Sequence, residues 1–226
     1  GKHFASLIII GGGVIGVECA SIYLPLGCKV TILEAAHLLP PMDREIAQRL
    51  TLTLKKQGAA ITVQAQVERV AGTPGCMTVT YRDKKGQVME VTAEGVLMAT
   101  GRRADAQDLF APGAAPELSR GAIVGDAVGR TSLPHLYVIG DARAGNIQLA
   151  HVAAAQAENA VAAILGREPP VDTAVVPSCV YTSPEIASVG LTEDEAKAAG
   201  LTVRTGKALT GANGKCLIEG AESGYL

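Results

Sequence analysis

The sequence predicts an α/β fold that opens with a Rossmann-like domain containing a parallel sheet and a β-hairpin. Three observations lead to this prediction. Residues 7–10 form an unbroken apolar run, which is typical of a parallel strand buried on both faces. Glycines spaced as GxGxxG follow at once, and a second apolar run, at residues 30–33, ends in the acid Glu34.

Each of the three glycines of the motif has a distinct expected role. Gly11 allows a tight turn after the first strand, and Gly13 lets the backbone approach a pyrophosphate. Gly16 lets the following helix pack closely against the strand. A helix from about Val14 would direct its N-terminal amides and the positive end of its dipole at the phosphates.

Glu34 is expected at the carboxyl end of the second strand, after the helix stops at Pro25 and Gly27. There its carboxylate can accept both hydroxyls of an adenosine ribose, whereas a 2′-phosphate would be repelled. Glu34 therefore favours NAD(H) over NADP(H). The alternative is a purely structural βαβ turn beside which Glu34 is incidental. The strand, helix and acid in this order favour dinucleotide binding.

The next hundred residues continue the pattern of strands and helices. Asp43 is placed to cap a helix that carries apolar residues at helical spacing and ends at Gly58. We then expect a strand over Ile61–Val67, a hairpin of residues 76–81 and 87–92, and a buried strand over residues 96–101. Because ligands lie beyond the carboxyl ends of parallel strands, Gly101 should lie near the dinucleotide.

Composition excludes several classes of partner. The chain has 226 residues and a formal net charge of −2, so neither nucleic acid nor an anionic membrane is the expected partner. Aromatic residues make up 3% of the chain, which argues against base-stacking platforms. No apolar run approaches the ~20 residues of a membrane helix. No secretory signal is visible, and we expect a cytoplasmic protein whose start at Gly1 looks like a cut.

The five cysteines show no metal-binding or redox spacing, because no two of them form a CxxC or similarly close pair. No metal site is therefore predicted. Cys19 and Cys28 flank the first helix and are expected to pack as small apolar residues, which is the default for a reduced thiol.

A domain boundary is expected within residues 111–134, where seven prolines and glycines indicate a linker. Beyond it, residues 136–139 predict a strand that leads to Asp141, and an alanine-rich helix begins at Leu149 and runs to about Leu165.

Six ordered motifs resemble the flavin-dependent pyridine nucleotide-disulfide oxidoreductases, and within them the members that oxidise dihydrolipoamide. They cover nearly all of the chain: GGGVIGVE (Gly11 to Glu18), VTILE ending at Glu34, ATGRR (Ala99 to Arg103), TSLPHLYVIGD (Thr131 to Asp141), LAH (Leu149 to His151) and VPSCVYTSPEIASVGLTE (Val176 to Glu193).

The resemblance implies three regions: an NAD-binding domain at residues 1–118, the returning part of an FAD-binding domain at 119–168, and part of an α+β dimerisation (interface) domain at 174–226. It also implies cofactor-binding roles. The pyrophosphate of NAD would be held by the glycine turn, the nicotinamide would lie by Glu18, and Val67 and Gly101 would line the cofactor. The full NAD set is Gly11, Gly12, Gly13, Val14, Ile15, Gly16, Val17, Glu18, Glu34, Val67 and Gly101.

For FAD, the resemblance implies that Asp141 binds the ribityl chain and that Gln148, Leu149, Ala150 and His151 present their backbone to the flavin. A helix N-terminus there would stabilise the anionic reduced flavin. His151 is interpreted as a positional residue rather than a base, because the family's catalytic histidine belongs to a later motif.

Three departures from the family pattern weaken the choice of substrate. Ala104 stands where proline is usual, the loop 142–148 is one residue longer, and Val152 replaces a common lysine. We expect the chain to be a fragment, because the family's CxxxxC pair and its histidine-glutamate pair are absent. No catalytic residue is therefore expected in this chain, which alone would at best bind NAD(H) weakly.

The function expected of the parent protein is electron transfer from dihydrolipoamide through a cysteine disulfide and FAD to NAD⁺, as a homodimer, with a lipoyl-bearing protein of a multienzyme complex as a possible partner. Two alternatives stay open. One is another flavoprotein of the group, such as an NADH oxidase or a mercuric or glutathione reductase. The other is a non-catalytic NAD-binding module.

Overall fold

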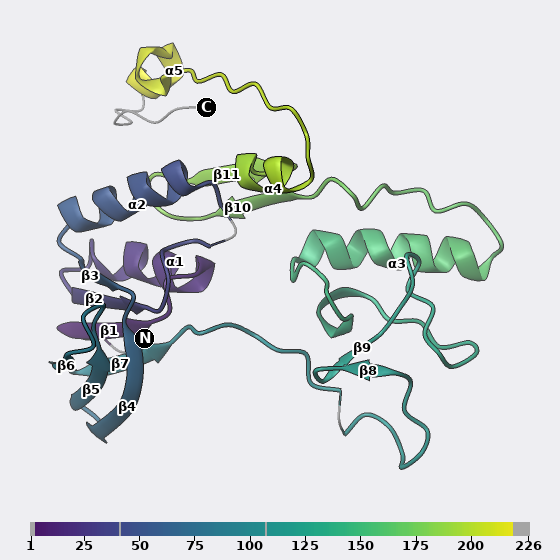
Figure 1. Cartoon of the computed structure of the whole chain (residues 1–226), viewed down its shortest axis with the longest axis horizontal. Coiled ribbons are helices and arrows are strands. Elements are labelled where there is room, and N and C mark those ends of the chain that lie inside the picture. The colour runs from purple at the N-terminus through teal and green to yellow at the C-terminus, as the bar shows by residue number, and fades with distance from the viewer. Residues whose placement is uncertain (1–2, 41, 107, 219–226) are drawn as a thin grey trace. The chain divides into compact units, whose positions relative to one another are not determined.

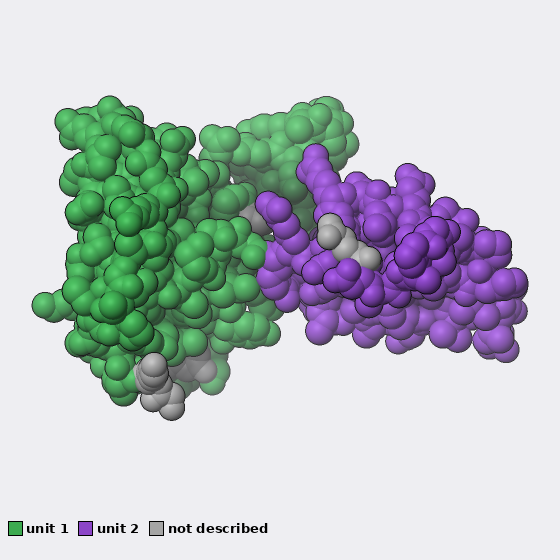
Figure 2. All heavy atoms as spheres, turned by 90° about the horizontal axis from the view of Figure 1, so that it is seen from below, with its two compact units in different colours: residues 1–101, 177–226 green, residues 102–176 purple. Residues whose placement is uncertain are grey.

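The computed structural model describes residues 3–40, 42–106 and 108–218. The chain forms two compact units, of which unit 1 combines residues 1–101 with 177–226 and unit 2 comprises residues 102–176 (Figures 1 and 2). No helix in the described ranges is long and apolar enough to cross a membrane. The predicted domain boundaries at residues 118 and 174 stay predictions.

A four-stranded parallel sheet forms the centre of unit 1 and confirms the predicted α/β fold. Its strands run in the order β3-β2-β1-β7 and comprise Ala60–Val63, Lys29–Glu34, Ser6–Ile10 and Gly95–Met98. Helix α1 (Val14–Tyr23) connects β1 to β2, and helix α2 (Arg44–Lys56) connects β2 to β3. Gly27, with φ of +80°, lies in the left-handed region after α1, as predicted.

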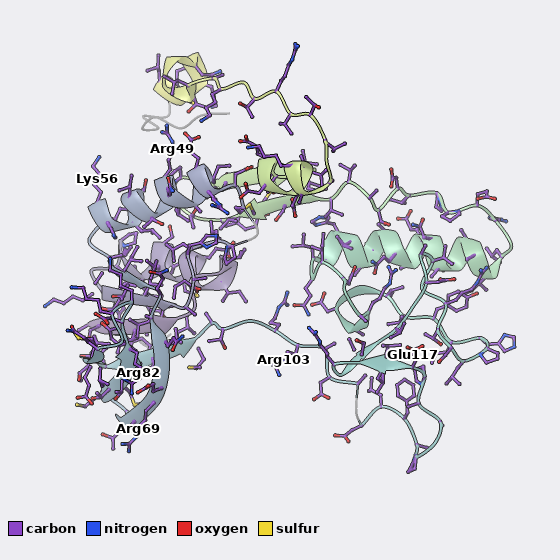
Figure 3. The ribbon with its side chains drawn as sticks, in the orientation of Figure 1. Arg49, Lys56, Arg69, Arg82, Arg103 and Glu117 are labelled. Atoms are coloured by element: carbon purple, nitrogen blue, oxygen red, sulfur yellow. The ribbon has the colours of Figure 1, made fainter. Side chains whose placement is uncertain are left out.

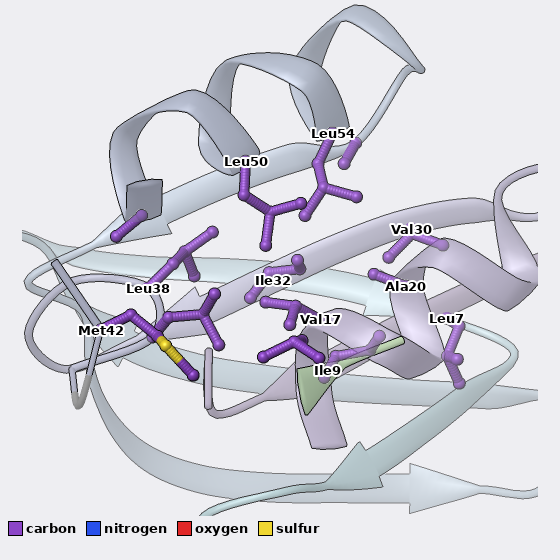
Figure 4. Close-up of a cluster of buried hydrophobic side chains, with 14 of the residues drawn as sticks. Leu7, Ile9, Val17, Ala20, Val30, Ile32, Leu38, Met42, Leu50 and Leu54 are labelled. Carbon is purple, nitrogen blue, oxygen red and sulfur yellow. The ribbon is translucent and has the colours of Figure 1, made fainter. Parts of the chain in front are cut away.

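Both faces of the parallel sheet are covered, which explains the apolar run without alternation. Leu7 and Ile9 of β1 pack toward α1 and α2, where Val17, Leu50 and other apolar side chains form the largest core cluster (Figure 4). Ile8 of β1 lies in a second cluster, with residues of a separate antiparallel sheet. The sheet is therefore the middle of three layers.

The antiparallel sheet has the strand order β4-β5-β6, with β4 at Gln66–Thr73, β5 at Cys76–Arg82 and β6 at Val88–Ala93. Its last two strands confirm the predicted hairpin. The charged side chains of Arg69 and Arg82 belong to this sheet (Figure 3), and Arg82 pairs with Glu68 across the strands.

The single strand predicted over Ile61–Val67 is wrong. Residues 60–63 belong to the parallel sheet as β3, whereas residues 66–73 belong to the antiparallel sheet as β4. The two strands are separated by Gln64, whose φ is +54°, and by Ala65, whose N–H donates to the Glu34 carbonyl over 2.9 Å. The left-handed residue turns the chain out of one sheet and into the other.

Asp43 is the N-cap residue of α2, as predicted, but its side chain makes no capping hydrogen bond. Asp43 Oδ1 instead accepts a hydrogen bond of 3.3 Å from Glu193 N, far along the chain.

Residues 177–218 of unit 1 begin with a hairpin of β10 (Pro177–Val180) and β11 (Ile186–Val189), which lies beside α1 and α2 (Figure 1). Val180 is fully buried in the same cluster as Leu7 and Val17. The segment continues through α4 (Glu193–Ala198), the 3₁₀ turn η2 (Thr210–Ala212) and α5 (Gly214–Ile218).

Unit 2 has a small core of Ala106, Ile123 and Val138. The segment predicted to be a linker contains a short hairpin of β8 (Leu118–Ser119) and β9 (Ala122–Ile123). Helix α3 (Ala150–Ile164) confirms the predicted alanine-rich helix.

The strand predicted over residues 136–139 is wrong as a sheet element. This segment makes a single isolated bridge, from Tyr137 to Arg130. An extended apolar run becomes a strand only when a second strand exchanges backbone hydrogen bonds with it. No second strand lies beside it within the described residues of unit 2.

Candidate functional site

The glycine turn between β1 and α1 is tightly packed on one side. Gly11 has φ of +108°, and a Cβ added to it would lie 2.3 Å from the carbonyl oxygen of Ala99. A Cβ on Gly16 would lie 2.0 Å from the carbonyl oxygen of Gly11, so α1 approaches the turn too closely for a side chain. Gly12 is equally confined, since its Cβ would meet the side chain of Leu38 at 2.2 Å.

Gly13 differs from the other glycines of the turn. Its φ is −72°, which any residue adopts, and a Cβ on it would meet no atom within 4 Å. A glycine that the fold itself does not require, beside open space, is what the close approach of a ligand demands.

The N-terminus of α1 faces the same space with its backbone donors. Gly13 is the N-cap residue, no side chain caps the helix, and the first turn carries no acidic residue. Uncapped amides and the positive end of the helix dipole together favour an anion. Ile15 is 45% exposed, whereas Val17 is buried in the core and Val14 packs partly against it.

Glu34 is directed back at the glycine turn. Its Oε2 accepts a hydrogen bond of 2.6 Å from Gly12 N, and its Oε1 accepts one of 2.7 Å from Ala36 N. An ionised carboxylate has about four acceptor sites, so two further hydroxyl donors can still be accommodated. The acid is thus held at the carboxyl end of β2 with acceptor capacity to spare.

Gly101 and Val67 lie near the carboxyl ends of the parallel strands. Gly101 follows β7, is exposed, and has φ of +118°. Val67 is half-buried and packs against the core cluster beneath the antiparallel sheet. The chain reaches Val67 directly after Ala65, whose amide is bound to the Glu34 carbonyl.

Glu18 makes a contact that the sequence did not reveal. Its Oε1 accepts a hydrogen bond of 2.8 Å from Tyr181 N, at the end of β10. Burial and then the negative charge of Glu18 raise the pKa of the neighbouring Cys19 thiol. The two residues are 163 positions apart, so the local sequence pattern gives no sign of this contact, although both segments belong to motifs that resemble the family.

The residues expected around the flavin gather in unit 2. Asp141 lies in the 3₁₀ turn η1 (Gly140–Ala142), and its Oδ2 is 3.4 Å from Arg102 Nη1. Arg102 Nη2 also donates to the Gln148 carbonyl over 3.1 Å. Helix α3 begins at Ala150 after the N-cap residue Leu149, and the His151 side chain is exposed in its first turn. One guanidinium therefore connects Asp141 to the segment that leads into α3.

A buried polar network, which the sequence analysis did not predict, connects the η1 turn and the loop after it to helix α3. The buried Gln156 Oε1 accepts from Gly140 N over 2.7 Å, and Gln156 Nε2 donates to Asn146 Oδ1 over 2.7 Å. Asn146 Nδ2 in turn donates to the Gly140 carbonyl over 2.8 Å. The available signal was an amide side chain within an otherwise alanine-rich helix, because buried amides require partners.

The structure thus brings the predicted site residues together in two groups, one in each unit. Unit 1 holds the residues expected to bind NAD, around the glycine turn and the carboxyl ends of the parallel strands. Unit 2 holds those expected to bind FAD, around η1 and the start of α3.

Comparison with known proteins gives two family matches. Residues 2–157 match the sequence model described as "Pyridine nucleotide-disulphide oxidoreductase", and residues 176–226 match that family's dimerisation domain.

Curated relatives include the dihydrolipoyl dehydrogenases of Bacillus subtilis (strain 168), 40% identical over 98% of this chain and 47% of that protein, and of Rhizobium etli, 36% identical over 98% and 46%. The chain spans about half the length of the curated relatives it matches.

The fold of the chain is also similar to that of solved structures. The HOCl-induced flavoprotein disulfide reductase RclA from Escherichia coli matches with a TM-score of 0.86 and 30% identity, over 100% of this chain and 51% of that chain. LpdA from Mycobacterium tuberculosis matches with a TM-score of 0.84 and 28% identity, over 97% and 47%.

Proposed function

Because the chain belongs to the pyridine nucleotide-disulphide oxidoreductase family, we propose that unit 1 binds NAD(H) and that the chain is part of a dihydrolipoyl dehydrogenase. The family uses FAD and NAD(H). In the proposed reaction dihydrolipoamide loses two electrons and two protons. The two electrons and one of the protons would end on NAD⁺ as the hydride of NADH, and the other proton would be released to solvent.

The observation that carries the proposal is the open space at Gly13 beside the uncapped start of α1. A pyrophosphate there would accept hydrogen bonds from the backbone amides of residues 13–16. Their partial positive charge would compensate the negative charge of the phosphates without a lysine. The exposed Ile15 would flank this contact, and the buried Val17 would hold the start of α1 in place from the core. Val67 and Gly101 would line the adenosine side. Glu18 would meet the nicotinamide end.

Glu34 supports NAD(H) rather than NADP(H). Its carboxylate is held at the end of β2 by two backbone amides, so it cannot easily turn away from a ligand. The following residues, Ala35 and Ala36, offer no cation to a 2′-phosphate. A phosphate beside a fixed carboxylate would therefore stand uncompensated.

Unit 2 would supply part of the FAD site of the same protein. Asp141 would accept hydroxyls of the ribityl chain, and the backbone from Gln148 to His151, including Leu149 and Ala150, would face the flavin ring. When bound, FAD would accept the electrons of the dithiol and pass them on to NAD⁺. The chain's own contribution is to orient the cofactor and to place the dipole of α3 beside it.

The proposed protein is a homodimer that acts with a lipoyl-bearing partner in the cytoplasm. Residues 176–226 match a dimerisation domain, which supports a homodimer. A lipoyl-bearing protein as partner and a cytoplasmic location rest on the likeness to dihydrolipoyl dehydrogenases. The similarity to RclA favours a second candidate, a flavoprotein disulfide reductase with a different substrate, which would use the same NAD site.

The test is a thermal-shift titration of the chain with NAD⁺ and NADP⁺ in parallel, with and without FAD. A ligand that binds only the native state at 100 times its Kd adds about 2.7 kcal/mol to the unfolding free energy. We expect NAD⁺ to raise the melting temperature and NADP⁺ to do so only at much higher concentration. No response to either nucleotide would refute the proposed site.

A further inference from the structure

The contact between Glu18 and Tyr181 joins the proposed nucleotide site to the β10–β11 hairpin. Glu18 Oε1 accepts the backbone N–H of Tyr181 over 2.8 Å. Its second oxygen, Oε2, accepts no hydrogen bond from any residue in the ranges that the structure describes. One half of the carboxylate is therefore held, and the other half remains available to a ligand.

The hairpin does not depend on Glu18 for its position. Val180, directly before Tyr181, has 0% exposure and lies in the core cluster of unit 1. Ser21 Oγ, one turn after Glu18 on α1, accepts a hydrogen bond of 2.9 Å from Ser183 N. Gln57 Nε2, after α2, donates to the Ser183 carbonyl over 3.2 Å. The Tyr181 N–H is thus a donor fixed by the fold.

A fixed donor changes what a glutamate can do. The Glu18 side chain is only half-buried, so without a partner it would sample several rotamers. A charge-assisted hydrogen bond from an ordered amide selects one of them. The side chain then loses its conformational entropy when the protein folds, and this loss does not weaken ligand binding.

We propose that the Tyr181 amide is a positioning group for the nucleotide: it holds Glu18 so that Oε2 accepts the N–H of the carboxamide at the nicotinamide end. This inference rests on the proposed NAD(H) function. It makes the β10–β11 hairpin, which belongs to the segment matching a dimerisation domain, a support of the nucleotide site.

The test compares two ligands that differ at one end. NAD⁺ carries the nicotinamide, whereas ADP-ribose ends at the ribose and cannot contact Glu18 through a carboxamide. Isothermal titration of the chain with each ligand gives the ratio of the two dissociation constants. A change in the fold alone moves both constants, but a change in the position of Glu18 moves only that of NAD⁺.

Four variants separate the roles. Tyr181→Pro removes the backbone N–H, but it also removes the exposed ring and restrains the backbone. Tyr181→Ala is its matched control, because it removes the ring and keeps the N–H. Ser21→Ala breaks the neighbouring bond between hairpin and helix, and Glu18→Ala removes the carboxylate. Because a hydrogen bond to a charged group is involved, we expect Tyr181→Pro and Glu18→Ala to weaken NAD⁺ binding about fivefold to tenfold. The dissociation constant of ADP-ribose should change by less than about twofold.

Ser21→Ala should leave the ratio of the two constants unchanged, and Tyr181→Ala should restore it. If Tyr181→Pro weakens both ligands equally, or neither, the positioning role is overturned while the nucleotide site stands. If the unchanged chain binds neither ligand, the proposed function fails and the inference fails with it.

A second measurement needs no variant and therefore does not depend on the folding of Tyr181→Pro. Coupling between two sites is reciprocal, so a nucleotide that needs Glu18 in place must protect the Tyr181 amide. We expect NAD⁺ to slow hydrogen exchange at Tyr181 more than ADP-ribose does, with both ligands saturating. Equal protection by the two ligands would overturn the inference.

Discussion

Replacing two glycines of the same turn by alanine should separate folding from ligand binding. Gly11→Ala places a Cβ 2.3 Å from the Ala99 carbonyl oxygen at a residue with φ of +108°. Backbone strain of about 1–3 kcal/mol and overpacking of about 1–3 kcal/mol together predict a loss of unfolding free energy of about 3 kcal/mol or more. For a chain of this size that corresponds to a fall in melting temperature of roughly 6–12 °C.

Gly13→Ala should behave in the opposite way. Its Cβ enters open space at an ordinary φ, so the only cost to the fold is the poorer N-cap residue, about 0.5 kcal/mol. That Cβ would stand where the pyrophosphate is expected, and NAD⁺ binding should weaken at least tenfold, which is about 1.4 kcal/mol.

Circular dichroism melts and calorimetric titration with NAD⁺ measure the two effects on each variant. The reasoning is refuted if Gly13→Ala binds NAD⁺ as well as the unchanged chain does, because the pyrophosphate then does not approach Gly13. It is also refuted if the two variants melt at the same temperature, because the space around each glycine then does not determine how much the substitution destabilises the fold.

Three further predictions concern other parts of the chain. Gln156→Leu should destabilise unit 2 by about 1–3 kcal/mol, because it leaves the buried N–H of Gly140 without an acceptor. Urea unfolding of residues 102–176, monitored by hydrogen exchange, measures this loss, and an unchanged unfolding curve would contradict the prediction. Burial, and then a nearby carboxylate, raise the pKa of the Cys28 thiol, so iodoacetamide at pH 8 should modify Cys28 far more slowly than the exposed Cys76, and equal rates in peptide mapping would argue against it. Hydrogen bonds from the backbone N–H and then the hydroxyl of Thr192 lower the pKa of Glu195. The ionised carboxylate therefore stabilises α4 fully at a pH above the usual glutamate pKa of about 4.3, and this stabilisation should be lost as the pH falls through the lowered pKa. Glu195→Gln should remove that pH dependence from the NMR shift of the Thr192 amide, which donates to the Glu195 carboxylate over 2.8 Å, and its persistence would show that another group titrates.

The local elements of unit 1 were predictable because each carries its own signal. The apolar run of β1, the glycine turn and the acid that ends β2 determine short-range geometry, and the structure confirms β1, α1, β2, α2 and the hairpin of β5 and β6. The strand over residues 61–67 was wrong because the alternation of apolar and polar residues continues through Gln64, and only the left-handed backbone of Gln64 reveals the change of sheet.

Contacts between distant segments were not predictable from the sequence pattern. Neither the hydrogen bond from Tyr181 to Glu18 nor the pair of Arg102 and Asp141 has a local signal, because tertiary packing brings these residues together. The strand expected at residues 136–139 fails for a related reason. Strand formation depends on a neighbouring strand and not on the apolar run alone.

The most direct test of the central claim is an NMR titration of the isotopically labelled chain with NAD⁺. If the nucleotide lies over the glycine turn, the amides of residues 11–18, together with those of Glu34 and Gly101, should shift with one common dissociation constant. NADP⁺ at the same concentrations should leave these amides nearly unchanged. Shifts confined to residues 102–176, or equal shifts with both nucleotides, would contradict the account.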